Sequence, residues 1–196
     1  FHATKVFSTF EGGAIISPDA ETKKIIDRMK NFGIVSETEV ESVGINGKMS
    51  EIHAAMGLLQ LATINETLER RAAIDDIYRN GLSDIAGLRL PPVSRSSRHN
   101  HAYFPVRIMP PFALDRDGLY QARKQEHMRT RRYFYPLITD TQAYRHADSR
   151  LTPNARALSE QVLCLSLIHI SEPTRRTPIS YAVFCLKKRR GKRAAP

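Results

Sequence analysis

Residues 1–15 read F-H-A-T-K-V-F-S-T-F-E-G-G-A-I, and the interpretation of the whole chain depends on the lysine they contain. The glycine pair Gly12-Gly13 allows a tight turn, and the apolar run that follows it ends at Pro18, which predicts a short buried strand. A lysine taken alone is usually a solvated surface charge. In a partly desolvated site, however, an amine such as that of Lys5 can attack an aldehyde and carry a proton.

A second motif, G-I-N-G-K-M-S-E-I-H-A-A, occupies residues 44–55. Together the two stretches resemble the DegT/DnrJ/EryC1/StrS family, which are pyridoxal-phosphate aminotransferases acting on nucleotide-linked keto-sugars, and the resemblance continues to about Leu165. It implies an α/β fold, namely fold-type I of the PLP-dependent transferases (aspartate aminotransferase-like). The chain would hold the end of the large domain and most of the small domain, with its N-terminal side cut.

The resemblance assigns the chemistry to Lys5, which would form the Schiff base with pyridoxal 5′-phosphate and act as the proton-transferring base. One branch of the family, the dehydratases, has histidine at this position, so lysine favours amino transfer. The implied reaction moves an amino group, with glutamate as the expected donor, to a keto-deoxyhexose carried on a nucleotide diphosphate. The family's phosphate-binding serine would fall before Phe1, so we expect this chain alone to be inactive.

Asn46 occupies the position at which, in the family, an asparagine reaches the cofactor phosphate of the neighbouring subunit. The resemblance therefore implies a cofactor-binding role for Asn46 and a homodimer with composite sites in the full-length protein. From local sequence alone, an Asn-Gly turn is the competing interpretation.

Three residues of the run R-R-Y-F-Y-P-L, residues 131–137, are candidates for substrate binding. Arg132, Tyr133 and Tyr135 offer hydrogen-bond donors and flat faces suited to a hexose or its diphosphate. The run resembles family members that act on thymidine-diphosphate keto-deoxyhexoses. The alternative is that these side chains only pack an aromatic strand in the small domain.

Metal chemistry and a disulfide framework are not expected. His53, His99 and His101 lack an accompanying carboxylate and do not form a convincing ligand set. Cys164 and Cys185 are the only cysteines, which favours a reducing cytoplasm. Nothing in the sequence predicts a membrane span.

The expected organisation has four regions. Residues 1–48 would end the large cofactor-binding domain, 49–87 would form a long connecting helical region, 88–164 a small α/β domain, and 165–196 a tail without a fold. Periodicity and capping residues predict helices at 19–31, 50–85 (as one bent helix or two in tandem), 115–126 and 154–163, and strands at 14–16, 104–108 and 131–136, with a polar loop at 34–49. Pro105 favours an edge strand or a bulge.

The tail from Leu165 accounts for most of the basic charge. It holds eight basic residues against one acidic residue, a net charge of +7 out of the chain's +10. One interpretation is a nucleic-acid-binding arm centred on residues 187–190. We favour another: residues 165–175 and 179–186 resemble the in-frame translation of a transposase-type sequencing adaptor. Apart from the tail, a family relative kept as a regulatory or dimerisation module, with Lys5 unused, also remains open.

Resequencing the source DNA across the Cys164 codon tests the adaptor interpretation. We expect the genomic reading frame to diverge from the present sequence shortly after that codon. An uninterrupted genomic sequence encoding residues 165–196 would contradict it.

Overall fold

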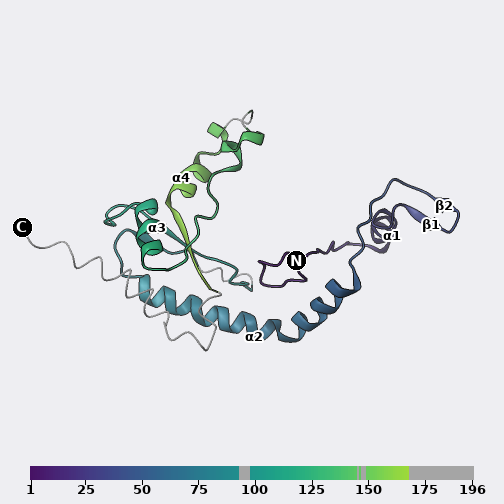
Figure 1. Ribbon diagram of the computed structural model, residues 1–196, viewed down its shortest axis with the longest axis horizontal. Helices are drawn as coiled ribbons and strands as arrows, with labels where there is room; N and C mark the ends of the chain where they lie inside the picture. The colour runs from purple at the N-terminus through teal and green to yellow at the C-terminus, as the bar shows by residue number, and fades with distance from the viewer. Residues whose placement is uncertain (93–97, 145, 147–148, 168–196) are drawn as a thin grey trace, which may run out of the picture. The chain divides into compact units, whose positions relative to one another are not determined.

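The computed structural model describes residues 1–92, 98–144, 146 and 149–167 (Figure 1). The chain forms two compact units, Phe1–Thr67 and a second unit that begins at Leu68. This division falls inside one long helix, α2 (Glu51–Leu82). The expected domain bounds near residues 48 and 87 therefore stay a prediction.

Helix α1 (Ala20–Met29) confirms the helix predicted at 19–31. Its N-cap is Asp19, whose carboxylate accepts a hydrogen bond of 2.7 Å from the backbone N–H of Thr22. The helix ends at Met29 with Lys30 as its C-cap, and Gly33, in the turn that follows, has a φ of +77°. A Cβ atom there would lie 1.7 Å from the carbonyl oxygen of Ser42, so only glycine fits.

The segment predicted to be a polar loop at 34–49 contains a short antiparallel hairpin beside α1 (Figure 1). Its strands are β1 (Ile34–Ser36) and β2 (Glu39–Val40). The strand predicted at 14–16 is wrong, because Ile15 and Ile16 are 74% and 95% exposed. A strand needs a neighbour for its backbone N–H and C=O groups, and in the described part of the chain no strand pairs with this segment.

Helix α2 is one continuous helix of 32 residues rather than two in tandem. It begins after Ser50, whose carbonyl oxygen accepts from the N–H of Ala54 at 3.0 Å. In its second half, Tyr78 and Leu82 are buried, and the spacing of four puts them on one face.

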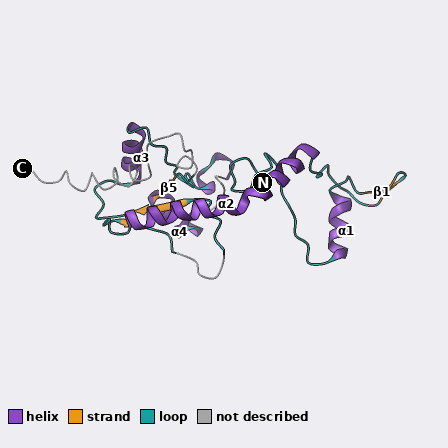
Figure 2. Ribbon diagram, turned by 90° about the horizontal axis from the view of Figure 1, so that it is seen from below, coloured by secondary structure: helices purple, strands orange, loops and turns teal. Residues whose placement is uncertain are grey.

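The second unit contains a three-stranded antiparallel sheet in the order β3-β4-β5, and α2 lies alongside it (Figure 2). The core consists of apolar side chains from α2, from the helix α3 (Arg116–Gln125), from all three strands and from the residues that follow α2 and β5: Ile74, Tyr78, Leu82, Ile85, Leu88, Phe104, Val106, Ile108, Leu119, Leu163 and Leu167. The strands are β3 (Leu88–Arg89), β4 (Phe104–Ile108) and β5 (Val162–Leu165). The alternation predicted for 104–108 is confirmed, since every second side chain of β4 is buried.

The edge strand predicted from Pro105 is wrong, because β4 is the central strand of the sheet. Proline is nevertheless tolerated for a local reason. Strand β3 pairs only with Arg107 and Ile108, so Pro105 has a strand partner on one side alone, at Cys164.

Helix α3 (Arg116–Gln125) confirms the helix predicted at 115–126, and Asp115 caps it by accepting from the N–H of Gly118 at 2.7 Å. Three short 3-10 turns precede the last helix, α4 (Pro153–Gln161): Ile138–Asp140, Gln142–Tyr144 and Ser149–Leu151.

Two predictions in this unit were wrong: the end of the last helix and the strand at 131–136. The helix predicted to reach Leu163 ends at Gln161, and the apolar run V-L-C-L becomes β5, because four successive apolar residues fit a buried strand as well as a helix. The strand predicted at 131–136 is reduced to one bridge, in which Arg131 pairs with Cys164. Among the described residues, no helix is both long and apolar enough to cross a membrane.

Replacing Asp115 by alanine should lower the free energy of unfolding of the second unit by about 1 kcal/mol, because the cap of α3 is lost. Urea unfolding followed by circular dichroism measures this change. Asp115→Asn keeps an oxygen acceptor and serves as the matched control. Equal midpoints for the two variants would contradict the capping role.

Candidate functional site

Lys5 lies in a loop, residues 1–12, that is closed by its own backbone. The N–H of Thr9 donates to the carbonyl oxygen of Phe1 at 3.0 Å, and the N–H of Lys5 donates to that of His2 at 2.9 Å. We call this segment the Lys5 loop. Its main chain is thus fixed at two points while the Lys5 side chain extends from a turn.

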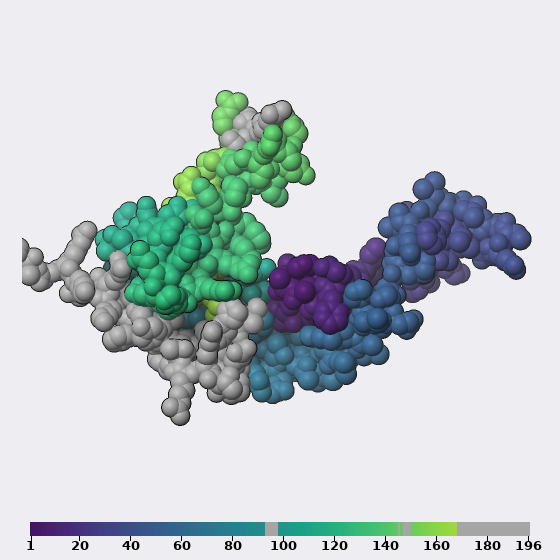
Figure 3. Space-filling view, viewed as in Figure 1, coloured from purple at the N-terminus to yellow at the C-terminus, as the bar shows by residue number. Residues whose placement is uncertain are grey.

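The Lys5 loop is anchored on the first half of α2 through Thr9, which is only 2% exposed. The Thr9 hydroxyl donates to the carbonyl oxygen of Glu11 at 2.6 Å, which satisfies its buried polar atom. A Cβ atom on Gly57 of α2 would lie 3.1 Å from the Thr9 methyl carbon. Glycine at this position therefore permits the close approach, and Figure 3 shows the purple loop against the blue helix.

The amine of Lys5 is available for chemistry. Its side chain is exposed and forms no ion pair within the described residues. Nearby polar groups bind one another instead: Nδ1 of His2 lies 3.0 Å from the hydroxyl of Thr4, and Nε2 lies 3.5 Å from a carboxylate oxygen of Glu11. Neither group neutralises the Lys5 ammonium by direct contact.

Asn46 lies beside the C-terminal end of α1, where it forms an isolated β-bridge with Asn31. The N–H groups on either side of it, of Ile45 and Gly47, donate to the carbonyl oxygens of Met29 and of the C-cap Lys30, each at 2.8 Å. Its amide is exposed and makes no hydrogen bond within the described residues. The backbone is thus held by a bridge rather than an Asn-Gly turn. No hydrogen bond, ion pair or ring contact joins Asn46 to Lys5 in this part of the chain.

The predicted substrate residues fall into two groups, and Arg132 and Tyr135 belong to the first. Arg132 Nη1 lies 3.0 Å from an oxygen of Asp117, and its guanidinium carbon lies 4.6 Å from the ring centroid of Tyr120 and 5.4 Å from that of Tyr135. The guanidinium carbon of Arg116 also lies over Tyr135, 4.5 Å from the centroid of that ring. This group is engaged with α3.

Tyr133 belongs to the second group, which is aromatic. Its ring stacks on that of Phe134 with centroids 4.8 Å apart and planes inclined by 8°, and it meets the Tyr103 ring edge-on at 5.5 Å. Arg131 donates a hydrogen bond to the Tyr133 hydroxyl. Phe134 is 68% exposed, so this stack presents an aromatic surface to its surroundings.

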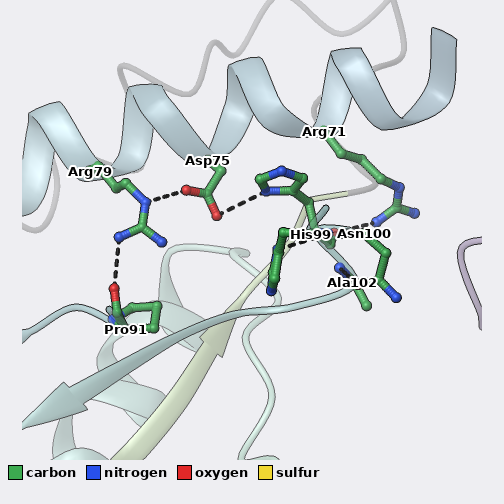
Figure 4. Close-up of polar contacts among 8 residues, drawn as sticks. Arg71, Asp75, Arg79, Pro91, His99, Asn100 and Ala102 are labelled. Atoms are coloured by element: carbon green, nitrogen blue, oxygen red, sulfur yellow. Dashed lines mark hydrogen bonds and ion pairs between the residues drawn. The ribbon is translucent and has the colours of Figure 1, made fainter. Parts of the chain in front are cut away.

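Sequence reasoning missed a charged network on α2. Arg71, Asp75 and Arg79 lie along one side of the helix (Figure 4). Arg71 and Asp75 contact His101, and Arg79 binds Asp75 and the carbonyl oxygen of Pro91. Their spacing of four residues was a usable signal, because it puts three charged side chains on one helix face. The described residues contain no group of histidine, cysteine and acidic side chains placed to hold a metal.

Cys164 is not equipped to act as a nucleophile. Burial raises the pKa of its thiol to about 11. The thiol therefore stays protonated near neutral pH, whereas the reactive form is the thiolate.

The sequence matches the profile of the DegT/DnrJ/EryC1/StrS aminotransferase family over residues 1–177, which extends past the limit of about Leu165 expected from the sequence. The dTDP-4-amino-4,6-dideoxy-D-glucose transaminase of Shigella dysenteriae is 46% identical over 168 residues, covering 85% of this chain and 46% of that protein. The protein of the same name from Escherichia coli is 46% identical over 161 residues, covering 81% of this chain and 43% of its own length.

Solved structures agree in fold. DesI, crystallised in the presence of its TDP-sugar product, is 30% identical with a TM-score of 0.78, and the match covers 97% of this chain and 49% of DesI. Helicobacter pylori PseC, an aminotransferase involved in the biosynthesis of pseudoaminic acid, has a TM-score of 0.80 at 19% identity over 96% of this chain and 51% of PseC.

The chain spans about half the length of these relatives, at 46% and 43% of the two curated proteins. The likeness in fold confirms the expected fold-type I α/β architecture. The family profile covers residues 1–177, which is most of the chain. Each of the two curated relatives is 46% identical to this chain over the aligned residues. The chain therefore belongs to the DegT/DnrJ/EryC1/StrS aminotransferase family.

Proposed function

We propose that this chain is part of a PLP-dependent aminotransferase that moves an amino group from glutamate to a keto-deoxyhexose linked to a nucleotide diphosphate. The observation that carries the proposal is the exposed Lys5 amine, without an ion-pair partner in the described residues, on a loop whose backbone is fixed. The two curated relatives are named for a dTDP-linked 4-amino sugar. Their names favour a TDP-linked 4-keto-6-deoxyhexose as the acceptor.

Lys5 would tether the cofactor, and the chemistry of its side chain fits this role. A primary amine condenses with an aldehyde only when it is accessible and can lose its proton, and no carboxylate contacts the Lys5 amine in the described residues. When bound, pyridoxal phosphate supplies an electron sink for the bonds at the amino acid's α-carbon.

The remaining steps depend on the chain's own groups. Lys5 Nζ would accept a proton at one position, the donor's α-carbon, and deliver it at a second position, the atom that receives the amino group. The fixed backbone of the Lys5 loop would keep the amine within reach of both positions, and its flexible side chain would let it move between them. The loop is kept in place by the buried Thr9, which packs closely against α2 because position 57 is glycine.

Asn46 would bind the cofactor phosphate of a neighbouring subunit in a homodimer. Two features support this role: its amide is exposed without an internal hydrogen bond in the described residues, and no hydrogen bond joins it to Lys5 of its own chain there. A side chain amide can donate to a phosphate oxygen at low cost when it has no bond to give up.

Sugar recognition would fall mainly to Tyr133, whose stack with Phe134 offers an aromatic surface to a hexose. Arg132 and Tyr135 would contribute less, because Arg132 is engaged with Asp117 and Tyr120.

We keep residues 1–48, 49–87 and 88–164 as the proposed domain division, and the cytoplasm as the proposed compartment. The tail without a fold was predicted to begin at Leu165, which is wrong, because Leu165 ends β5 and Leu167 lies in the core. From residue 168 on, the adaptor-like stretches and the basic run at 187–190 fall outside the described residues, so both interpretations of the tail stay open.

Replacing Lys5 by alanine in the full-length protein that carries this sequence should abolish the visible absorbance of lysine-bound pyridoxal phosphate. Borohydride reduction of the unmodified protein, followed by peptide mass spectrometry, should place the added pyridoxyl mass on Lys5. The matched control is Lys24→Ala, which removes another exposed lysine from α1.

The regulatory-module alternative predicts a different result. If Lys5 is unused, the spectrum of the unmodified protein shows no such band, and reduction labels Lys5 no more than Lys24.

A further inference from the structure

Asp75 is a buried carboxylate that the proposed chemistry does not use. It is 3% exposed, and its two oxygens face different partners. Oδ1 forms an ion pair with Nε of Arg79 on the same helix, and Oδ2 lies 3.3 Å from Nδ1 of His101. A carboxylate removed from water is strongly unfavourable unless it is paired, so both contacts matter.

The contact between Asp75 and His101 is a close approach rather than a well-directed hydrogen bond. Nδ1 of His101 is buried and makes no well-directed hydrogen bond within the described residues, although the carboxylate is within ion-pair range. Asp75→Asn keeps the shape of the side chain but replaces one carboxylate oxygen by an NH2 group, so it changes what this buried nitrogen faces.

Two arginines reinforce the same attachment. Arg71 Nη1 donates to the carbonyl oxygen of His101 at 3.1 Å, and Arg79 Nη1 donates to that of Pro91 at 2.8 Å. Figure 4 shows Arg71, Asp75 and Arg79 on the side of the helix that faces these groups. The helix thus holds the chain at two points, on either side of residues 92–100.

His101 is held in an unusual backbone conformation. Its φ is +47°, in the left-handed region, which is uncommon for residues other than glycine, although histidine adopts it more often than most. Its N–H donates to Nδ1 of His99 at 3.0 Å, and the two imidazole rings meet edge-to-face at 4.7 Å. The contacts from α2 help to stabilise this uncommon conformation.

The direction of the chain at His101 determines where Tyr103 lies, two residues later. The Tyr103 ring meets that of Tyr133 edge-on at 5.5 Å and that of Phe134 at 6.3 Å. Tyr103 therefore supports the stack that presents an aromatic surface. Two contacts, Asp75 with His101 and Tyr103 with Tyr133, are thus joined by the short stretch of backbone between His101 and Tyr103.

We propose that Asp75 is a positioning residue for nucleotide-sugar recognition: by holding His101, it fixes the Tyr103 ring behind Tyr133 and Phe134. This inference rests on the proposed function, because it assigns the stack to the sugar substrate. Asp75 touches neither the amino-acid donor nor Lys5 in this account. Its loss should affect the sugar half of the reaction and leave the donor half unchanged.

The first test is steady-state kinetics of the full-length protein that carries Asp75→Asn. We expect KM for the nucleotide keto-sugar to rise about tenfold, with kcat and the glutamate half-reaction within about twofold of the unmodified protein. Asp76→Asn is the matched control, since Asp76 is the neighbouring, exposed carboxylate of α2. An unchanged sugar KM in Asp75→Asn, or an equal loss in the glutamate half-reaction, would overturn the proposal.

A double variant tests whether Asp75 acts through His101. His101→Asn removes the imidazole while keeping a residue that tolerates the left-handed backbone. If Asp75 acts through His101, the double variant raises the sugar KM no more than the more severe single variant does. If the fold-increases in KM of the two single variants multiply in the double variant, the two residues act independently, and the proposal is overturned. Should Asp75→Asn fail to fold, His101→Asn alone gives the same test, and a normal sugar KM in that variant would also overturn the proposal.

A spectroscopic readout in the chain itself separates positioning from general stability. Tyr103→Leu defines the part of the near-ultraviolet circular dichroism that comes from the ring contacts. Asp75→Asn should lose the same signal while the far-ultraviolet spectrum is retained, whereas a retained near-ultraviolet signal contradicts the proposal. Failure of the proposed function looks different, because the unmodified full-length protein would then show no glutamate half-reaction.

Discussion

The packing of Tyr78 and Leu82 of α2 against Phe104 of β4 is the contact on which the second unit depends. Leu82 and Phe104 are completely buried, and the rings of Tyr78 and Phe104 lie 5.0 Å apart. The Tyr78 hydroxyl, whose pKa is raised by burial, donates to the carbonyl oxygen of Ser166 just beyond β5. One helix face is thereby attached to both the central strand and its neighbour, and the segment that carries His101 and Tyr103 enters β4 from this fixed point.

The sequence predicted the elements whose signals are local. Asp19 and Asp115 are N-caps whose side chains bond a nearby N–H, so α1 and α3 began where predicted. Strand β4 was found because alternation is a property of its own five residues. Where the outcome depended on a distant partner, prediction was wrong or incomplete: β5 exists because Leu163 and Cys164 pair with β4, and Ile15 stays unpaired because the described unit offers it no strand.

In the candidate site, too, the sequence predicted what depends on neighbouring residues and missed what depends on distant ones. Lys5 could be singled out because its neighbours resemble a family motif, and family membership is now established. The side chains that hold its loop could not be foreseen, since Thr9 and Gly57 are 48 positions apart and their contact appears only in the fold. For Arg132 and Tyr133, composition alone could not say that one would be engaged with α3 and the other would form an exposed stack. The proposed chemistry and the proposed sugar recognition thus draw on different units of the chain.

The central claim is that Lys5 carries a pyridoxal phosphate that exchanges an amino group with glutamate. The most direct test is the visible absorbance spectrum of the full-length protein with pyridoxal phosphate, recorded before and after glutamate is added. The account predicts a band from the lysine-bound cofactor that glutamate converts to the spectrum of the amine form. A protein that shows no such band, or a band that glutamate leaves unchanged, would contradict it.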